Sequence, residues 1–311
     1  MARVAFWTAA AACVIALVGG SVLAWRSYPD RMSPQQVARA YFVALARADA
    51  PAALGLGVVP RGSREFLTSA VLREQERIAP MHAISVGHVT RRGARASVEY
   101  RYTLRFAGGV QIYSGTLDLV DTASGWRLDR AAVSTKLVLA DAVDRLTFAG
   151  THFPASSTLL FPGALPARFD NPYLRLDPAT AAVEPTTGER TFVTVEPTDV
   201  ARTRLLRALG QTIDDCNRDS RPPPACPQAS RDVVPGSLRG RLLQPLSGGI
   251  TFGVSGPAGE VTMTGSVTFA GRYGELGPDN VVRQRAGRLV LPVTARAYPI
   301  TPLTIRLDGA G

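Results

Sequence analysis

The longest run of apolar residues stands at the beginning of the chain. Residues 4–25 contain no charged side chain, and about 20 apolar residues in a helix cross the core of a bilayer. The pattern therefore predicts a transmembrane anchor over residues 4–25, with residues 1–3 as a cytoplasmic tip. Cleavage after Ala24 as a signal peptide and lipid attachment at Cys13 remain alternatives, but the run exceeds the roughly 7–15 apolar residues of a cleaved signal.

Residues 33–137 begin with a helical period. Ser33 and Gln36 have the positions of an N-cap and of the glutamine that closes a capping box, so a helix begins there. Ser63 is placed to cap a second helix, which Pro80 ends. The apolar stripe of the first helix consists of Val37, Tyr41, Ala44 and Ala48.

A period of two follows these helices. Apolar and polar residues alternate from residue 96 to residue 106, which predicts a strand with one buried face. A Gly108-Gly109 turn leads to a second strand, whose apolar phase slips at Ser114-Gly115, as a bulge would cause. Helices on an antiparallel sheet predict an α+β domain over residues 33–137. The buried face of the first strand consists of Ala96, Val98, Tyr100, Tyr102, Leu104 and Phe106.

Two further regions complete the chain. Residues 145–197 are dense in proline, which is excluded from helix interiors and central strands, so we expect a Pro-rich β module of short edge strands. Residues 198–311 show a helix and then four alternating strands, which predicts an α+β domain with an antiparallel sheet. Whether it is a second copy of the first domain's plan is left open. The stripe of its helix consists of Leu205, Leu209, Ile213 and Cys216.

Two of the three cysteines lie close together in the sequence. A polar, proline-containing segment that can fold back as a turn separates Cys216 from Cys226, and a disulfide across so short a loop stabilises by about 2–3 kcal/mol. The alternative is two free thiols; zinc is not expected, because no third Cys or nearby His completes a tetrahedral site. Disulfides persist in oxidising compartments. The bulk of the chain is therefore expected outside the cytoplasm, beyond a cell membrane crossed once.

The chain carries a formal net charge of +10, and every basic residue except Lys136 is arginine. Either these arginines lie on solvent-exposed faces of helices and sheets, or they contact an anionic partner such as a lipid or a wall polymer. Nucleic acid is not expected as a partner, because the sequence contains no helix-turn-helix, zinc-finger or base-stacking pattern. It contains no phosphate-binding loop, nucleophile elbow or His-Glu-x-x-His motif either. We therefore expect no enzyme activity, no cofactor and no metal.

Two short motifs carry a resemblance to a known fold. The helix Ser-Pro-Gln-Gln-Val-Ala-Arg-Ala-Tyr at 33–41 and the strand Gly-Trp-Arg-Leu-Asp at 125–129 resemble the nuclear transport factor 2-like cone fold, above all its extracytoplasmic versions behind a membrane anchor. In penicillin-binding proteins a transpeptidase domain follows this fold. None is expected here, because Val133 stands where the Ser-x-x-Lys nucleophile before Lys136 would be. The Leu-Phe-Pro-Gly turn at 160–163, together with the cysteine loop, is similar to a set of actinobacterial membrane-anchored exported proteins of unassigned role.

Some relatives of the cone fold are enzymes that use an Asp, His or Tyr inside the cone, so the resemblance supplies candidates of these types. Asp118 is expected to point away from the apolar face, and His82 and His88 lie roughly 20 Å apart along one strand, too far to bind one metal. A buried tyrosine is usually a core residue. Catalysis is therefore not expected, and the candidates for lining a ligand pocket are Tyr100, Tyr102 and Leu104.

These observations predict a non-enzymatic, single-pass envelope protein. Its extracytoplasmic domains would act as an interaction scaffold or as an accessory subunit of a membrane complex, either secretion- or conjugation-like or related to the cell wall. Its partners would be other envelope proteins, with residues 4–25 in the membrane. The alternative is a carrier that holds a small ligand or a lipid in the cone cavity. That cavity would have to be open and apolar.

Overall fold

Strands make up most of the structure, which is a computed structural model of the chain. Among the residues that it describes, strands account for 51% and helices for 20%. The structure describes residues 32–139, 146–152, 154, 156–218, 226, 232–234, 236–243, 245–256, 259–298 and 304–307.

The chain divides into two compact units. The first contains Met1–Val138, Pro154–Pro166 and Pro178–Thr191, and the second contains Leu139–Phe153, Ala167–Asp177 and Phe192–Gly311. Residues 145–197, where the sequence predicts a Pro-rich module, therefore contribute segments to both units.

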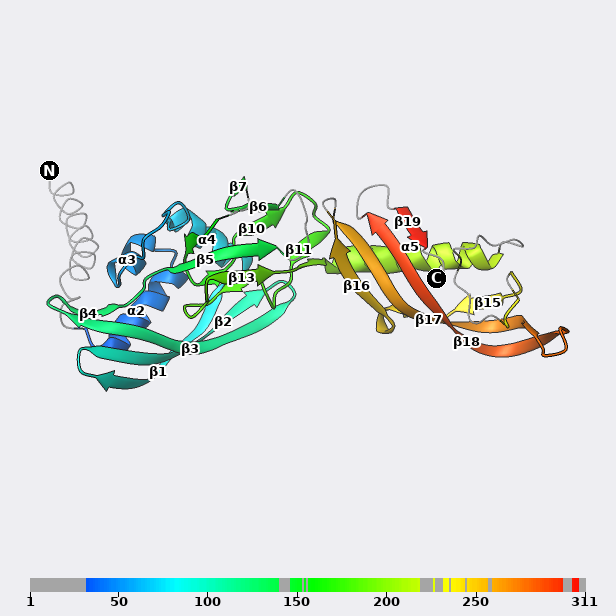
Figure 1. The fold of residues 1–311 in the computed structure, drawn as a ribbon, viewed down its shortest axis with the longest axis horizontal. Coiled ribbons are helices and arrows are strands. Elements are labelled where there is room, and N and C mark those ends of the chain that lie inside the picture. The colour runs from blue at the N-terminus through cyan, green and yellow to red at the C-terminus, as the bar shows by residue number, and fades with distance from the viewer. Residues whose placement is uncertain are drawn as a thin grey trace, which may run out of the picture. The chain divides into compact units, whose positions relative to one another are not determined.

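The described part of the first unit begins with three helices (Figure 1): α2 (Pro34–Ala46), α3 (Ala50–Gly55) and α4 (Ser69–Ile78). The capping box of α2 is confirmed, since the Ser33 hydroxyl accepts a hydrogen bond from the Gln36 backbone N–H and the Gln36 side-chain oxygen accepts one from the Ser33 N–H. The second long helix, α4, begins later than Ser63 indicates. Its N-cap is Thr68, whose hydroxyl accepts a hydrogen bond from the Val71 N–H.

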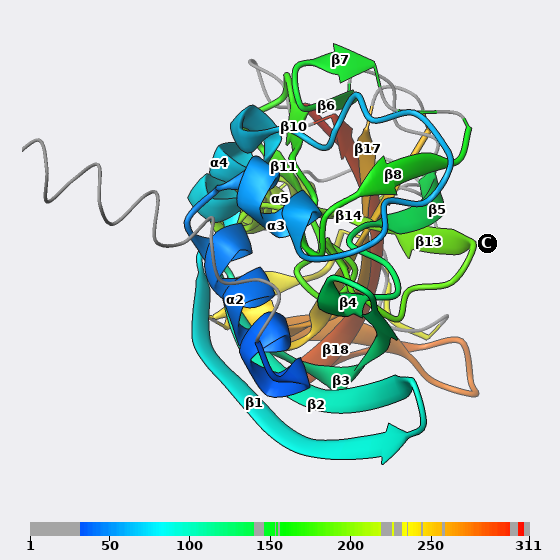
Figure 2. The ribbon, with the colours of Figure 1, turned by 90° about the vertical axis from the view of Figure 1, so that its left-hand side faces the viewer.

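A four-stranded antiparallel sheet curves around α2 (Figure 2). Its order is β1 (Met81–Arg92), β2 (Arg95–Phe106), β3 (Gly109–Thr122) and β4 (Gly125–Leu128). The alternation from residue 96 to residue 106 is confirmed, because every expected inward residue is buried. The bulge expected at Ser114-Gly115 is wrong, since β2 and β3 pair without a register shift along their described length. β3 keeps its phase and leaves Val110 and Ile112 exposed.

Short strands complete both units. In the first, β5 (Val133–Leu139) pairs with β8 (Thr158–Leu160), and β9 (Gly163–Ala164) pairs with β12 (Ala182–Val183). β13 (Arg190–Val193) borders β5. In the second, β6 (Leu146–Phe148) lies between β10 (Ala167–Phe169) and β7 (Thr151–His152), and β11 (Leu174–Leu176) pairs with β14 (Val195–Pro197). Strands this short are what dense proline permits.

One long helix and a five-stranded sheet form the rest of the second unit. α5 (Asp199–Arg218) lies along a sheet made of β15 (Arg239–Leu242), β16 (Ile250–Ser255), β17 (Glu260–Leu276), β18 (Val282–Tyr298) and β19 (Thr304–Leu307) (Figure 1). β15 and β16 pair with one edge of β17, β18 pairs with the other edge, and β19 pairs with β18. The expected apolar rows are buried, among them Leu205, Leu209 and Ile213 of α5, Val261, Met263, Val267 and Phe269 of β17, and Leu291, Val293 and Ala295 of β18.

The expected fold class is wrong in its transmembrane helix. Among the described residues, no helix combines the length and the apolar composition that crossing a bilayer needs. The longest of them, α5, carries charged residues such as Asp199, Arg202 and Arg207 and buries a single apolar stripe. Residues 4–25, where the sequence predicts the anchor, lie outside the described residues. The structure is thus a strand-rich arrangement of helices on antiparallel sheets.

A disulfide joins Cys216, in the last turn of α5, to Cys226, with 5.8 Å between their Cα atoms. This is the pair that the sequence predicts. The bond closes a short loop, with a sequence separation of 10, and so restricts the unfolded chain more than the folded one.

Glu76 lies near the end of α4 and contacts the start of the sheet. Its two carboxylate oxygens accept hydrogen bonds from the Met81 backbone N–H at 3.1 and 3.3 Å. Burial raises the pKa of Glu76 to about 7, and the Met81 hydrogen bond offsets this only in part. A carboxyl whose pKa rises on folding holds its proton more tightly in the folded chain, so the protonated form stabilises the fold.

Replacing Cys216 by serine should lower the melting temperature of the second unit by roughly 5–10 °C, because the lost constraint is worth about 2–3 kcal/mol. Calorimetry of the full chain without reductant measures this change. Reduction of the wild type should reproduce the loss, and the serine variant should not respond to reductant. Equal melting temperatures in all three samples would show that the disulfide does not stabilise the fold.

Glu76→Gln should remove one source of pH dependence. The stabilisation by the protonated carboxyl is fully present below about pH 4.5 and is lost as the pH rises through about 7. The variant should therefore resist chemical denaturation better than the wild type at pH 8 and equally well at pH 4. The exposed Glu65→Gln serves as the control. If Glu76→Gln loses as much stability between these pH values as the wild type does, the assignment fails.

Candidate binding site

The two tyrosines expected to line a pocket lie in the core of the first unit. The rings of Tyr100 and Tyr102 stack with centroids 5.8 Å apart, and Tyr102 stacks on Tyr113 of β3 at 5.4 Å. The ring of Phe42 of α2 packs against both, with its centroid 5.0 Å from that of Tyr100 and 5.3 Å from that of Tyr102. Tyr100 is 3% exposed, and Tyr102 and Leu104 are 0% exposed. These side chains fill the interior, and their role as pocket lining stays a prediction.

Gly115 of β3 makes the space for this stack. It lies directly opposite Tyr100 in the β2–β3 register. A Cβ atom at residue 115 would lie 2.9 Å from the Tyr100 hydroxyl oxygen and 3.2 Å from Cζ of the same ring. Glycine is therefore required where the ring crosses the neighbouring strand, and this explains why the apolar pattern of β3 is interrupted there.

A tight turn carries Glu184, whose charge acts on Tyr100, Tyr102 and Tyr113. The Glu184 N–H donates to the Thr187 hydroxyl at 2.8 Å, and the Thr187 N–H donates back to the Glu184 carbonyl at 3.0 Å. Burial raises the pKa of Glu184. Burial, with a smaller effect from the charge of Glu184, raises the pKa of Tyr113 to about 12.

The pKa of Tyr100 is also raised to about 12, again chiefly by burial. Burial raises the pKa of Tyr102 further. An interaction with the Thr186 side chain offsets part of the rise in the pKa of Tyr100. Among the described residues, neither buried hydroxyl makes a hydrogen bond of good geometry. Both tyrosines thus remain protonated at physiological pH, which suits packing better than proton transfer.

The other candidates named by the resemblance lie apart from this interior. Asp118 accepts a hydrogen bond from the Ser97 hydroxyl at 3.1 Å on the exposed side of the sheet, as expected from its position. His82 and His88 are exposed on β1. Across the described ranges, no group of three or more His, Cys, Asp or Glu side chains is placed to hold a metal.

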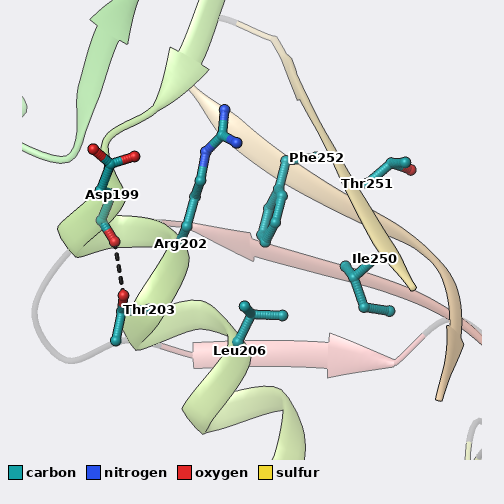
Figure 3. Close-up of a pocket in the computed structure, with 7 residues that line it drawn as sticks. All are labelled: Asp199, Arg202, Thr203, Leu206, Ile250, Thr251 and Phe252. Carbon is teal, nitrogen blue, oxygen red and sulfur yellow. Dashed lines mark hydrogen bonds between the residues drawn. The ribbon is translucent and has the colours of Figure 1, made fainter. Parts of the chain in front are cut away.

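The second unit contains a pocket of about 540 Å³ between α5 and β16 (Figure 3). One wall is an arginine stacked on an aromatic ring, since the guanidinium carbon of Arg202 lies 5.6 Å from the centroid of Phe252. Cation–π contacts of this kind contribute about 0.5–1 kcal/mol at exposed sites. The lining residues are Asp199, Arg202, Thr203 and Leu206 of α5 and Ile250, Thr251 and Phe252 of β16.

A network of ion pairs holds Arg202 in place. Its Nε donates to the Pro197 carbonyl at 3.1 Å, and its guanidinium pairs with Glu196. Glu196 also pairs with Arg175 at 2.7 Å, and Arg175 reaches Asp199 at 3.3 Å. Two arginines and two carboxylates balance each other. The network therefore orients Arg202 over Phe252 without giving the pocket a net charge.

The pocket lies at an edge of the sheet. Ile250 is buried toward the core and Thr251, the next residue, is exposed on the opposite face; both contact the pocket. Among the described strands β16 shares a ladder with β17 alone, and β14 lies near it without pairing. The outer edge of β16 thus offers backbone N–H and C=O groups beside the Phe252 wall.

Sequence reasoning missed this pocket. The pattern of residues 198–311 predicts only a helix and alternating strands there, and neither Phe252 nor Arg202 is among the candidate site residues. Nothing local links them, because the chain brings them together only after the helix and the sheet have packed. Two features could have pointed to the pocket: the position of β16 at an edge of the sheet, and the presence of Arg202 in the first turn of α5.

Gly115→Ala should destabilise the first unit by about 1–3 kcal/mol, because the added methyl group overpacks the Tyr100 ring. Tyr100→Phe alone should be nearly neutral, since the buried hydroxyl that it removes makes only a weak interaction, with Thr186. In the double variant the phenylalanine should recover part of the loss. Denaturant unfolding of the four proteins measures the coupling. Strict additivity of the two changes would contradict the contact.

No protein-family model matches the chain, and no curated protein matches it. Several solved structures are similar in part, among them the following two. A SEC-C motif containing protein from Rhodopseudomonas palustris has a TM-score of 0.29 and 18% identity, over 37% of this chain and 88% of that one. A protein named as an NTF2-like transpeptidase from Campylobacter jejuni has a TM-score of 0.24 and 13% identity, over 31% of this chain and 97% of that one. At TM-scores this low, neither likeness assigns a fold or an activity to the chain.

Proposed function

We propose that the chain is a non-enzymatic interaction protein that works outside the cytoplasm, as a scaffold or accessory subunit among envelope proteins. Its second unit binds an extended segment of a partner protein at the pocket between α5 and β16. The disulfide between Cys216 and Cys226 supports the compartment, because such bonds are rare where thiols are kept reduced.

The packing of the first unit favours this function over that of a carrier. A carrier needs an open interior to hold its ligand, whereas Tyr100, Tyr102 and Leu104 are buried against their neighbours. Their rings contact one another and Phe42 rather than lining an empty space. This packing supports a function in which partners bind at the surface.

The observation that carries the proposal is the position of the pocket at the unpaired edge of β16. An extended peptide can add to such an edge through main-chain hydrogen bonds, while a neighbouring pocket receives one of its side chains. Leu206, Ile250 and Phe252 offer that side chain an apolar surface. Arg202 and Asp199 stand at the same wall and can pair with polar groups of the segment.

Peptides selected from a random display library on the immobilised full chain test this proposal. The selected peptides should bind with an affinity that Phe252→Ala lowers ten-fold or more, the usual effect of truncating an aromatic anchor. Arg202→Ala should lower it less, because Glu196 keeps its pairing with Arg175. Ile112→Ala, which removes an exposed aliphatic side chain from the first unit, is the matched control and should change nothing.

Hydrogen exchange identifies the mode of binding. A selected peptide should slow exchange at the amides of Ile250–Ser255, since strand addition gives that edge new hydrogen bonds. Each variant is compared with the wild type by its melting temperature, so that loss of binding is separated from loss of folding. Peptides that bind equally well to Phe252→Ala and leave β16 unprotected would refute the proposal.

A further inference from the structure

One face of the sheet in the second unit carries four arginines. Arg239 of β15 lies directly opposite Arg272 of β17. Arg241 of β15 lies opposite Ala270 of β17, whose partner on β18 is Arg288. Residues opposite each other in a ladder project to the same face, and positions two apart on a strand share a face. The four arginines therefore occupy two adjacent rows of three neighbouring strands.

The buried residues between these positions show which face this is. Leu242 of β15 lies opposite Phe269 of β17, and Phe269 lies opposite Leu289 of β18. Leu242 and Phe269 are buried, so the intervening positions point away from the core. All four arginines are exposed. The basic face is defined here as Arg239, Arg241, Arg272 and Arg288.

Three of the four arginines of the basic face have no acidic partner among the described residues. Among the described residues, Arg241, Arg272 and Arg288 form no ion pair and no side-chain hydrogen bond. Arg239 donates to the carbonyls of Gly236 and Leu238, both at 2.8 Å.

Two acids toward the tip of the β17–β18 hairpin form ion pairs with other arginines. Glu275 pairs with Arg285 at 2.8 Å, and Asp279 pairs with Arg283 at 2.5 Å. Neither acid is therefore available to Arg272 or Arg288, which lie on the two strands of this hairpin and can bind an anion instead.

Aliphatic side chains flank the arginines on the same face. Leu276 lies opposite Val282 nearer the tip of the β17–β18 hairpin, and the two are 39% and 50% exposed. Val290, two residues beyond Arg288, is 59% exposed. Residues 272 and 276 of β17 share a face because their numbers differ by an even number, and so do residues 282, 288 and 290 of β18. The pairing of Leu276 with Val282 places both sets on the same face. Charge and exposed apolar surface are thus combined on one side of a β-ribbon.

We infer that the basic face is a contact site for the surface of an anionic lipid bilayer. Lipid phosphates accept hydrogen bonds from the guanidinium groups, and the aliphatic side chains enter the boundary between headgroups and acyl chains. A soluble polyanion would satisfy the arginines but would leave Leu276, Val282 and Val290 in water. The inference rests on the ladder register and does not depend on the pocket at β16.

Hydrogen exchange of the full chain with vesicles tests the inference at the site itself, so that binding through any other segment does not obscure the result. Vesicles of phosphatidylcholine with a third of phosphatidylglycerol should slow exchange at residues 276–282. Vesicles of phosphatidylcholine alone should not, and high salt should weaken the protection. Protection that is equal with both kinds of vesicle, or is absent with both, would overturn the inference.

Two double variants separate charge from apolar contact. Arg272→Gln with Arg288→Gln should raise the anionic lipid concentration needed for half-maximal protection roughly thirty-fold, because each arginine near the surface contributes about five-fold. Leu276→Ser with Val282→Ser should also weaken protection by lipid. The control, Arg101→Gln with Arg105→Gln, removes two exposed arginines from one face of β2 and should behave as wild type.

Inorganic polyphosphate serves as the competing probe. If polyphosphate protects residues 276–282 as well as anionic vesicles do, and the serine variant keeps that protection with both probes, the basic face recognises a soluble polyanion and the lipid inference fails. Loss of the vesicle effect in the serine variant, with no protection by polyphosphate, supports lipid contact.

Discussion

The first unit depends on the close passage of the Tyr100 ring over the backbone of Gly115. Because residue 115 has no Cβ atom, the ring lies flat across the neighbouring strand and stacks on Tyr102. The two rings then form the surface on which Phe42 and α2 rest. The missing side chain at residue 115 thus allows tyrosine and phenylalanine rings to fill the space between the sheet and α2. A larger residue at 115 would press against the Tyr100 ring and disturb this packing.

Local patterns predict the structure well where a residue's own neighbours decide the outcome. Ser33 and Gln36 satisfy each other within one turn, so their capping box can be read directly from the sequence. Alternation from residue 96 to residue 106 fixes the buried face of β2 for the same reason. The prediction fails where a distant partner decides. Gly115 interrupts the apolar pattern as a bulge would, and only the Tyr100 ring on the neighbouring strand explains the glycine. The N-cap of α4 is Thr68 instead of Ser63, a choice that the residues around Ser63 do not reveal.

The pocket at β16 is beyond sequence reasoning because its parts gain meaning only in three dimensions. Arg202 is oriented by Glu196 and Pro197, which precede the helix, and by Phe252, which follows it at a large distance in the chain. The basic face differs, since its rows emerge from the ladder register as soon as the strands are paired. The two surfaces also work by different physics. The pocket is electrically balanced and relies on shape and backbone groups, whereas the basic face relies on unbalanced charge.

The chain passes between its two units five times, at residues 138, 153, 166, 177 and 191. A first unit emerging from a ribosome or a translocation channel is therefore incomplete until residue 191 has appeared, because Pro154–Pro166 and Pro178–Thr191 belong to it. By then part of the second unit has already been delivered. Until then the sheet around α2 lacks two segments of its own unit, and incomplete folding units with exposed apolar surface are prone to aggregate. Evolution likewise cannot exchange one unit by a single genetic crossover, so the two are inherited as one piece.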